Sequence, residues 1–523
     1  MPRRFVLLFF FLASTLAAAK PNIVLITISS ANKLSSALAH DSLIFDRAYA
    51  QSPETISSTA TILTGTYPQT HHAGELGGAL APTLPFLSDL LHGYRSAAFV
   101  STIQLDPKNG SAQGFSRGFA TYDAGFHRAA KGEGRFVSVE RRAPEVVARA
   151  TAWLAQNSKS PFFLWVQLND SGDVAIAKLF ATLKTQKLYD DSLVVIAADH
   201  GQSLGAHGED SHGIFLYDET VHVPLLLKMP QNQNAGKKVQ ARVGLIDIAP
   251  TILEVAGIPV PSQMQGQSLL RSAKSESDRP AYSRSDLPQR AFGWSPLESW
   301  RAGKYLYIRA PKPELYDLTL DPGAKKNLSQ SSKATLDTMA AQLNAFDARF
   351  TAQAGKSTEL TSTEMQKLAS LGYVGLQKSP VGGTAVTGVD PKDTIDIANK
   401  VFAAIAFLND GKPDRALATL PMPLPNAYLA QYAAGAALAQ QQQYPQAVAR
   451  LHQAIELQPD SAWAHYQMGL CLLKTADYKT AAVHLEIATN RLPDFAAAHD
   501  LLAQAYDHLG RAEDARRQRS KTK

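Results

Sequence analysis

The chain has 523 residues and a net charge of +6, with 45% apolar and 19% charged residues. This length suits two or three domains, and the composition supplies enough apolar surface for buried cores. The charge excess is too small to favour a nucleic-acid partner, and the single cysteine, Cys471, excludes an internal disulfide or a zinc cluster built on cysteines.

Residues 1–19 have the pattern of an export signal. Arg3 and Arg4 precede an apolar run over residues 5–16, and three alanines then provide a small-residue cleavage site. The run has about twelve residues, whereas about twenty are needed to span a bilayer. We expect cleavage near Lys20 and export to the periplasm or the extracellular space, with no membrane span left afterwards. An uncleaved anchor is the alternative.

Continuous apolar and β-branched runs predict strands that are buried on both faces. They lie at 22–28, 95–101, 162–168, 192–198 and 223–229. Helical patterns alternate with them at 83–93, 142–157 and 244–258. This alternation predicts an α/β domain over 20–350, with a mostly parallel sheet sandwiched by helices. In such a sheet, functional side chains follow the carboxyl ends of the strands.

The composition changes after residue 350. Residues 351–395 are rich in Thr, Ser, Gly, Lys and Gln, which predicts a linker. A period of 34 residues then recurs at Pro425, Pro459 and Pro493, at Gly435 and Gly469, at Tyr444 and Tyr478, at Ala447 and Ala481, and at Ala454 and Ala488. This pattern resembles the tetratricopeptide repeat and implies an all-α domain over 396–515 that binds a protein or peptide partner. The basic residues 516–523 are expected to form a solvated tail.

The densest group of candidate metal ligands follows the predicted strand at 192–198. Asp199 and His200 come directly after this strand, and His207 and His212 lie in the glycine-rich loop that follows. Carboxylate and imidazole groups suit zinc, manganese and similar divalent ions. The sequence therefore predicts a divalent-metal site at this edge of the sheet.

Several segments, taken in order, resemble the sulfatase branch of the alkaline phosphatase superfamily. Residues 20–28 are similar to its first strand, 48–68 to its nucleophile segment, and 198–228 to its second metal-binding signature. Later landmarks match at 245–270 and 314–328, and 368–375 resembles the close of members that carry tetratricopeptide repeats. The resemblance implies an α/β sandwich that cleaves a sulfate or phosphate ester with a nucleophile held on a divalent metal.

The resemblance assigns the nucleophile position to Thr55, and metal binding to Asp199, His200, His212 and Asp170. His207 becomes a candidate substrate-binding residue. Many sulfatases derive their nucleophile from a cysteine, which this chain lacks in that domain. A threonine nucleophile is typical of phosphodiesterase-like and phosphatase-like relatives, so a phosphate ester is the favoured substrate. The alternative for Thr55 is an ordinary helix N-cap.

The chain also departs from the family pattern at several positions. After the first strand, Ser29 and Ser30 stand where the family has metal-binding carboxylates. Gly172 stands at the position of a metal-binding histidine, and Gln167 at a position where a histidine is common. Thr59 stands at the position of a basic residue. Mutation of residues that only hydrogen-bond to metal ligands already costs about 10–100-fold in metal affinity or activity, so loss of the ligands themselves should cost more. We therefore expect at most one weakly held divalent ion per chain, or none.

Two hypotheses follow for the protein as a whole. In the favoured one, the domain hydrolyses esters weakly or not at all, and the protein serves as an interaction scaffold through its repeats. In the alternative, Thr55 is the nucleophile of an active metal-dependent hydrolase. His71 and His72 are either a phosphate-facing pair or part of a surface turn, and Glu209 and Asp210 are expected to be solvated.

Overall fold

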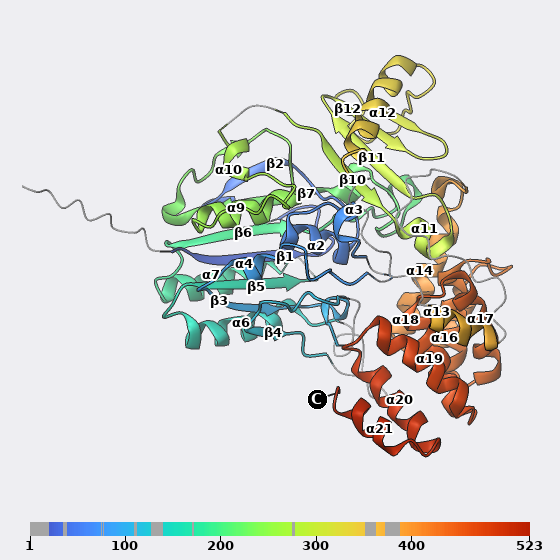
Figure 1. Ribbon diagram of the computed structural model, residues 1–523. Helices are drawn as coiled ribbons and strands as arrows, with labels where there is room; N and C mark the ends of the chain where they lie inside the picture. The colour runs from blue at the N-terminus through green and yellow to red at the C-terminus, as the bar shows by residue number, and fades with distance from the viewer. Residues whose placement is uncertain are drawn as a thin grey trace, which may run out of the picture.

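The computed structural model describes residues 20–34, 39–74, 76, 78–108, 112–126, 140–169, 172–274, 278–350, 362–371 and 388–522. The predicted export signal and the candidate ligand Asp170 lie outside these ranges. Figure 1 shows an α/β domain with a small antiparallel sheet at one end and the repeat helices beside it. Within the described ranges, no helix has the length and apolar character needed to cross a bilayer.

The main sheet has the strand order β4-β3-β5-β1-β6-β7-β2-β8, with β9 also paired to β2. Its strands are β1 (Asn22–Ile28), β2 (Leu43–Tyr49), β3 (Arg95–Phe99), β4 (Thr121–Asp123), β5 (Phe162–Leu168), β6 (Ser192–Ala198), β7 (His222–Lys228), β8 (Lys238–Val239) and β9 (Val243–Gly244). The five neighbouring strands β4, β3, β5, β1 and β6 are parallel to one another. Strand β7 is antiparallel to both of its neighbours, β6 and β2. The predicted mostly parallel sheet is confirmed.

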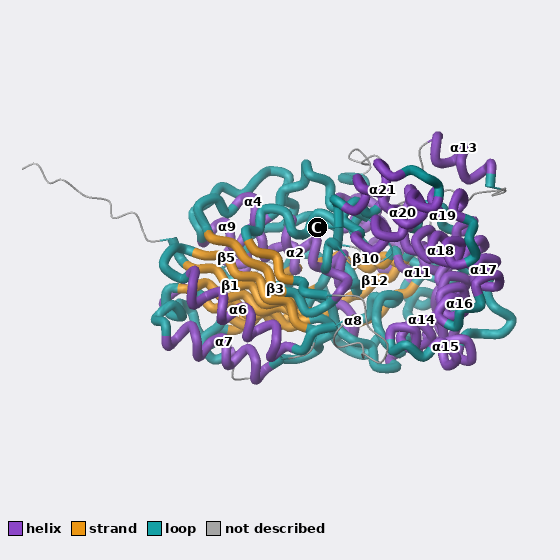
Figure 2. Tube along the Cα trace, turned by 90° about the horizontal axis from the view of Figure 1, so that it is seen from below, coloured by secondary structure: helices purple, strands orange, loops and turns teal. Residues whose placement is uncertain are grey.

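Helices cover both faces of this sheet, with α6 and α7 on one side and α2, α4 and α9 on the other (Figure 2). Their bounds are α2 (Thr55–Thr64), α4 (Leu87–Leu90), α6 (Ala143–Asn157), α7 (Asp173–Thr185) and α9 (Ile248–Val255). Shorter elements are α3 (Pro68–His71), α8 (Asp218–Val221), α10 (Leu269–Ser272), α11 (Leu287–Phe292), and the 3-10 turns η1 (Ile103–Leu105), η2 (Ala206–Gly208), η3 (Pro230–Asn232), η4 (Leu245–Asp247) and η5 (Pro391–Asp393).

Two predicted helices are shorter in the structure. The helix expected over 83–93 is reduced to α4, because Pro85 disfavours a helical conformation in the residue before it. The helix expected over 244–258 becomes β9, η4 and then α9. Both differences lie at the ends of the predicted helices and leave the order of elements unchanged.

A second, antiparallel sheet was not predicted. It has the order β10-β11-β12-β13, formed by Ala281–Ser285, Leu297–Ala302, Tyr305–Arg309 and Glu314–Asp317, and α12 (Lys333–Asp347) packs against it. Aromatic side chains from both, including Tyr282, Trp300 and Phe346, form a separate small core.

The C-terminal region is all-α, as predicted. It comprises α14 (Ile395–Asn409), α15 (Pro413–Thr419), α16 (Tyr428–Gln440), α17 (Tyr444–Leu457), α18 (Ala462–Lys474), α19 (Tyr478–Arg491), α20 (Ala496–His508) and α21 (Ala512–Arg519). A Cβ atom on Gly435 would lie 2.7 Å from Leu451 Cγ, and one on Gly469 would lie 2.5 Å from Leu485 Cγ. The recurring glycines therefore stand where the two helices of a pair approach too closely for any side chain.

Two features of this region differ from the expectation of a linker followed by a separate domain. Within the compositional linker, residues Ser362–Ser370 form a helix, α13. The first repeat helix, α14, also shares its core with the α/β domain, since Ile395, Ala398 and Val401 belong to the same buried cluster as Ile214 and Tyr217. The repeat region is thus packed against the rest of the protein from its first helix.

Candidate functional site

The parallel register of the sheet determines where the site lies. Ile28, at the end of β1, pairs with Leu168 of β5 on one side and with Ala198 of β6 on the other. The residues that follow these strands therefore emerge side by side at the carboxyl edge. Ser29 and Asp199 are neighbours for this reason, although 170 residues separate them in sequence.

Thr55 and His200 are in direct contact at this edge. Thr55 is the first residue of α2, and its Oγ1 lies 3.1 Å from His200 Nε2. His200 Nδ1 lies 2.8 Å from the Gly201 carbonyl oxygen and donates to it, so Nε2 is left to accept from the Thr55 hydroxyl. Burial lowers the pKa of His200 to about 4, which keeps the ring neutral at pH 7. The Thr55 side chain is therefore directed at His200 and does not serve as a helix cap.

A chain of neutral hydrogen bonds crosses the edge from β3 to β6. The Ser101 backbone N–H donates to Gln167 Oε1 at 2.8 Å, and Gln167 Nε2 donates to Ser29 Oγ at 3.0 Å. Ser29 Oγ in turn donates to Asp199 Oδ2 at 2.9 Å. All four residues are at most 9% exposed. The side chains of Gln167 and Ser29 thus have hydrogen-bond partners within this edge of the sheet.

Asp199 is the one carboxylate in this series of hydrogen bonds, and it is fully buried. Burial raises its pKa to about 8, against the opposing effect of the Ser29 hydrogen bond. Its Oδ1 atom has no hydrogen-bond partner among the described residues and lies 3.6 Å from His200 Nε2. Asp199 and His200 are therefore the pair best placed to hold an ion.

The two remaining histidines of the loop are placed differently from each other. The His212 ring lies 4.0 Å from the His200 ring, and its Nδ1 is 3.1 Å from the Pro53 carbonyl oxygen, so it flanks the Thr55–His200 contact. His207 instead stacks on Tyr217 with ring centroids 3.5 Å apart. This contact gives His207 a packing role, and its expected role in substrate binding stays a prediction.

The two adjacent histidines, His71 and His72, differ in exposure. His71 is buried, accepts from the Ala73 N–H at 3.1 Å and contacts Thr61 Oγ1 at 3.0 Å, and burial lowers its pKa to about 3. His71 is therefore a structural residue of the helix pair. His72 is exposed and lines a cavity of about 30 Å³ together with Arg284 and other polar residues.

Glu209 corrects one expectation. It is only 1% exposed, and its carboxylate accepts from the backbone N–H groups of Ile214 and Phe215 at 2.8 and 3.3 Å. Burial raises its pKa to about 7. The sequence predicts a solvated Glu209, because charged loop residues usually are. In the structure the loop folds around Glu209, whose carboxylate joins two parts of the loop by hydrogen bonds.

The first repeat helix holds the same loop from outside. Asn399 Nδ2 donates to the Gly208 carbonyl oxygen at 2.7 Å, and Asn399 Oδ1 accepts from the Asp210 N–H at 3.1 Å. The helix approaches so closely that a Cβ atom on Gly208 would lie 3.3 Å from Ile395 Cγ2. Nothing in the sequence marks Asn399 for this role, because its partners are backbone atoms about 190 residues earlier.

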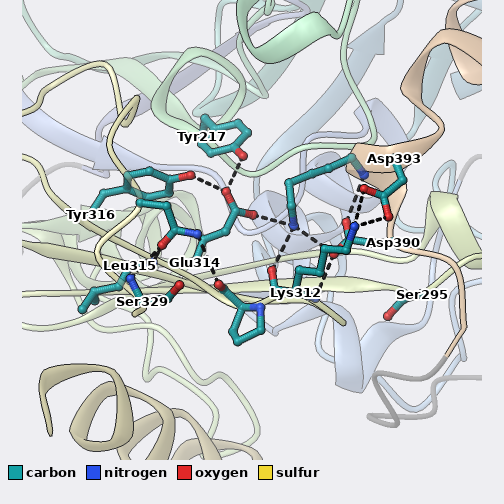
Figure 3. A network of polar contacts seen from close by, with 12 residues as sticks. Tyr217, Ser295, Lys312, Glu314, Leu315, Tyr316, Ser329, Asp390 and Asp393 are labelled. Carbon is teal, nitrogen blue, oxygen red and sulfur yellow. Dashed lines mark hydrogen bonds and ion pairs between the residues drawn. The ribbon is translucent and has the colours of Figure 1, made fainter. Parts of the chain in front are cut away.

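A second link joins the loop to the start of the repeat region through Glu314 (Figure 3). Glu314 is buried and accepts from the hydroxyls of Tyr217, at 2.6 Å, and Tyr316. Lys392, just before α14, lies 2.9 Å from the same carboxylate and 3.0 Å from Asp390. The site loop, the small sheet and the repeat region are thereby joined in one polar network.

The described residues do not assemble a complete metal centre. Within these ranges, no three or more His, Cys, Asp or Glu side chains form a group able to hold a metal ion. Of the residues predicted as metal ligands, Asp199, His200 and His212 lie together, while Asp170 falls outside the described residues.

Comparison with known proteins agrees with this architecture. The sulfatase family model matches residues 20–171 and 170–258, and a TPR repeat model matches residues 435–475. The chain is 27% identical over 168 residues to the uncharacterized sulfatase YidJ of Escherichia coli, covering 32% of this chain and 33% of that protein. It is 31% identical over 151 residues to a Delta 4,5-hexuronate-2-O-sulfatase of Bacteroides thetaiotaomicron, covering 27% and 31%.

These matches span about a third of the length of the curated relatives. In structure, the chain resembles the phosphonate monoester hydrolase of Agrobacterium radiobacter, with a TM-score of 0.53 at 18% identity over 63% of this chain and 96% of that one. This likeness supports the fold. The α/β domain therefore contains a match to the sulfatase family over residues 20–258, and the C-terminal helical region contains a match to the TPR repeat over residues 435–475.

Proposed function

We propose that the sulfatase-like domain of this protein hydrolyses esters weakly or not at all, and that the protein works as a binding scaffold through its repeats. The observation that carries the proposal is the hydrogen-bond chain from Ser101 through Gln167 and Ser29 to Asp199. Metal ligands must be deprotonated and available to the ion. Here neutral groups occupy that place and are already bonded to one another.

Few donors remain for a divalent ion. Asp199 offers one carboxylate and His200 one imidazole nitrogen, and among the described residues His212 does not complete with them a group of three able to hold a metal ion. Catalytic zinc sites use three protein ligands and structural ones four. Burial also favours the protonated form of Asp199, which is a poor ligand. These residues do not fit a tightly held divalent ion, so we expect at most one weakly bound ion per chain, or none.

The second candidate function is hydrolysis of a phosphate or sulfate ester with Thr55 as nucleophile. It is favoured by the contact between Thr55 and His200, because a neutral imidazole at 3.1 Å is placed to accept the hydroxyl proton. A phosphate ester is the favoured substrate, since Cys471 lies buried in the repeat helix α18 and is remote in sequence from the nucleophile position. The 4% exposure of Thr55 weighs against this function.

Elemental analysis and activity assays on the full-length protein decide between the two. We expect at most one weakly held divalent ion per chain and background turnover of aryl phosphate monoesters, diesters and sulfates. Robust turnover that vanishes in Thr55→Ala and in Asp199→Asn would instead establish the hydrolase. Turnover that survives Thr55→Ala would place the chemistry elsewhere in the protein.

A rescue experiment tests the reason for the loss. Ser29→Asp combined with Gly172→His returns one carboxylate and one imidazole to the edge, so metal content measured by mass spectrometry should rise. The matched control, Ser29→Asn with Gly172→Gln, adds similar volume without a carboxylate or an imidazole and should leave metal content unchanged. Equal metal content in both double variants would mean that missing ligands are not what limits binding.

We also propose that the protein is exported by residues 1–19 to the periplasm or the extracellular space. The charged start, the short apolar run and the alanines support this proposal. A fusion of residues 1–25 to a reporter that is active only after export should be active. A fusion in which Arg3, Arg4 and the apolar run are disrupted should not be.

A further inference from the structure

The helix α13 lies against the repeat helices, although its composition predicts a linker. Both Figure 1 and Figure 2 place it beside the repeats. Leu368 is fully buried within the cluster that contains the repeat core. The segment of chain before the repeats therefore contributes an apolar side chain to the cluster that contains the repeat core.

Two ion pairs fix α13 on the repeat helix α19. Glu364 Oε2 lies 2.6 Å from Arg491 Nη2, and Asn490 Nδ2 donates to Glu364 Oε1 at 3.4 Å. Lys367 Nζ lies 2.6 Å from Glu486 Oε2. The side chains of Glu364 and Arg491 are 9% and 15% exposed, so this pair is shielded from salt more than a surface pair would be.

The receiving surface is held in place by the repeats themselves. Glu486 also accepts from the Tyr506 hydroxyl at 2.8 Å and lies 3.8 Å from Arg511, so α20 and the following turn orient it. We call Glu486, Asn490 and Arg491, with the apolar site of Leu368, the α19 surface. Because Glu486 is oriented by contacts within the repeats, this part of the α19 surface is organised independently of α13.

The α13 segment, by contrast, depends on the surface it contacts. It has 9 residues, fewer than the roughly 12–15 that an isolated helix needs to be even marginally stable in water. Its helical form is therefore stabilised by docking, and an equivalent segment from another chain can make the same contacts. The contact is suited to exchange.

We propose that the α19 surface is the partner-binding surface of the repeat region and that α13 is its internal ligand. The contacts of α13 define the chemistry of the partner. It is a short amphipathic helix with an acidic residue, a basic residue three positions later and a leucine directly after it, as in Glu364, Lys367 and Leu368. This inference rests on the proposed role of the repeats in binding a protein partner.

The probe is a labelled peptide with the sequence of residues 362–371, titrated into the full-length protein by fluorescence anisotropy. In the wild type, α13 competes from the same chain at an effective concentration in the millimolar range. Leu368→Asp in the protein releases α13, and we expect the peptide to bind this variant at least about 10-fold more tightly than the wild type. Equal affinity for the two proteins would overturn the inference.

Two further variants keep the test independent of folding. Glu364→Arg with Lys367→Glu in the protein reverses both charges of α13 without touching its apolar contact, and should also tighten peptide binding. Adding Arg491→Glu to the Leu368→Asp protein should abolish binding of the natural peptide. A peptide carrying Glu364→Arg should bind that protein again, which a purely structural defect would not allow.

The outcome can be separated from that of the proposed function. Peptide binding together with robust ester hydrolysis would refute the loss of hydrolysis and leave the α19 surface established. Peptide affinity that is unaffected by Arg491→Glu would refute the α19 surface, whatever the hydrolysis assays show.

Discussion

Single residues decide the character of the site, because its polar groups are buried and must find partners. Ser29 is the central example, since it accepts from Gln167 and donates to Asp199 at the same time. A buried polar group that loses its partner costs about 1–3 kcal/mol, more than a typical hydrogen bond contributes. The hydroxyl of Ser29 is therefore accommodated by the polar groups on either side of it.

At this scale we predict that Ser29→Ala destabilises the protein by about 1–3 kcal/mol, because it removes the hydroxyl that donates to the buried Asp199 Oδ2. Gln167 Nε2 keeps the Leu168 carbonyl oxygen and Asn169 Oδ1 as acceptors. Chemical unfolding measured by fluorescence provides the comparison. Ser30→Ala, one position along the chain, is the control and should change the midpoint little. Equal midpoints for Ser29→Ala and the wild type would show that water or a neighbour replaces the hydroxyl.

Elements act through the contacts they make with one another, and the loop from Ser203 to His212 is held on both sides. Glu209 forms hydrogen bonds within the loop, and Asn399 of α14 forms hydrogen bonds to the backbone of the loop from outside. The loop carries the histidine that flanks Thr55 and His200, so the order of the site depends on a helix that belongs to the repeats.

We predict that Asn399→Ala speeds hydrogen exchange in residues 203–213 by about 10-fold, which corresponds to the loss of about 1.4 kcal/mol of hydrogen bonding. Exchange in β1 should not change. Lys400→Ala, an exposed neighbour on the same helix, serves as the matched control. Unchanged exchange in Asn399→Ala would mean that the loop is ordered by its own contacts alone.

A recurring contact in the repeats links their sequence period to pH. Gln431 Nε2 donates to the Pro425 carbonyl oxygen, and 34 residues later His465 Nε2 makes the same contact with the Pro459 carbonyl oxygen at 2.9 Å. His465 also contacts His484 through its other nitrogen at 2.8 Å. Burial lowers the pKa of His465 to about 4. Burial, together with the neighbouring His465, also holds the pKa of His484 well below its ordinary value.

Because the folded pKa of His465 lies below its ordinary value of 6.5, the unfolded chain binds more protons between pH 6.5 and 4. The free energy of unfolding of the repeats should therefore fall as pH drops through this window, by up to about 1.4 kcal/mol per pH unit for each such histidine. His465→Gln, which copies the residue of the preceding repeat, should reduce this slope. Helical melting curves by circular dichroism at pH 4.5, 5.5 and 6.5 measure it, and identical slopes would contradict the assignment.

At the scale of the whole molecule, the repeat region is part of the core and not a detachable unit. Ile395, Ala398 and Val401 of α14 are buried with residues of the site loop, and Phe402 packs on Phe292. Removing α14 would expose this apolar surface on the α/β domain.

We predict that a chain ending at residue 375 melts several degrees lower than the full-length protein, since each large apolar side chain removed from its contact costs about 1.5–3 kcal/mol. A chain ending at residue 409, which keeps α14, should recover much of the loss. Differential scanning calorimetry of the three chains checks this. Equal melting temperatures for the α/β transition in all three would show that the α14 contact contributes nothing to its stability.

The sequence by itself determined the elements whose pattern is local. Continuous apolar runs located β1, β5 and β6 to the residue, and the 34-residue period located the all-α repeat region. The ordered motifs indicated the resemblance to sulfatases that the family model also finds, and the two serines after β1, Ser29 and Ser30, were visible without coordinates. Periodicity and residue identity are properties of short segments, so the sequence alone specifies them.

Only the tertiary structure decided which partners those residues have. The hydrogen-bond chain through Gln167, the burial of Glu209 and the clamp by Asn399 join residues that are distant in sequence or use backbone atoms. The second sheet and the docking of α13 likewise arise from packing that their own short, weakly patterned segments do not specify. Long-range contacts leave no periodic pattern in the local sequence, because their energies depend on which surfaces meet after the chain has folded.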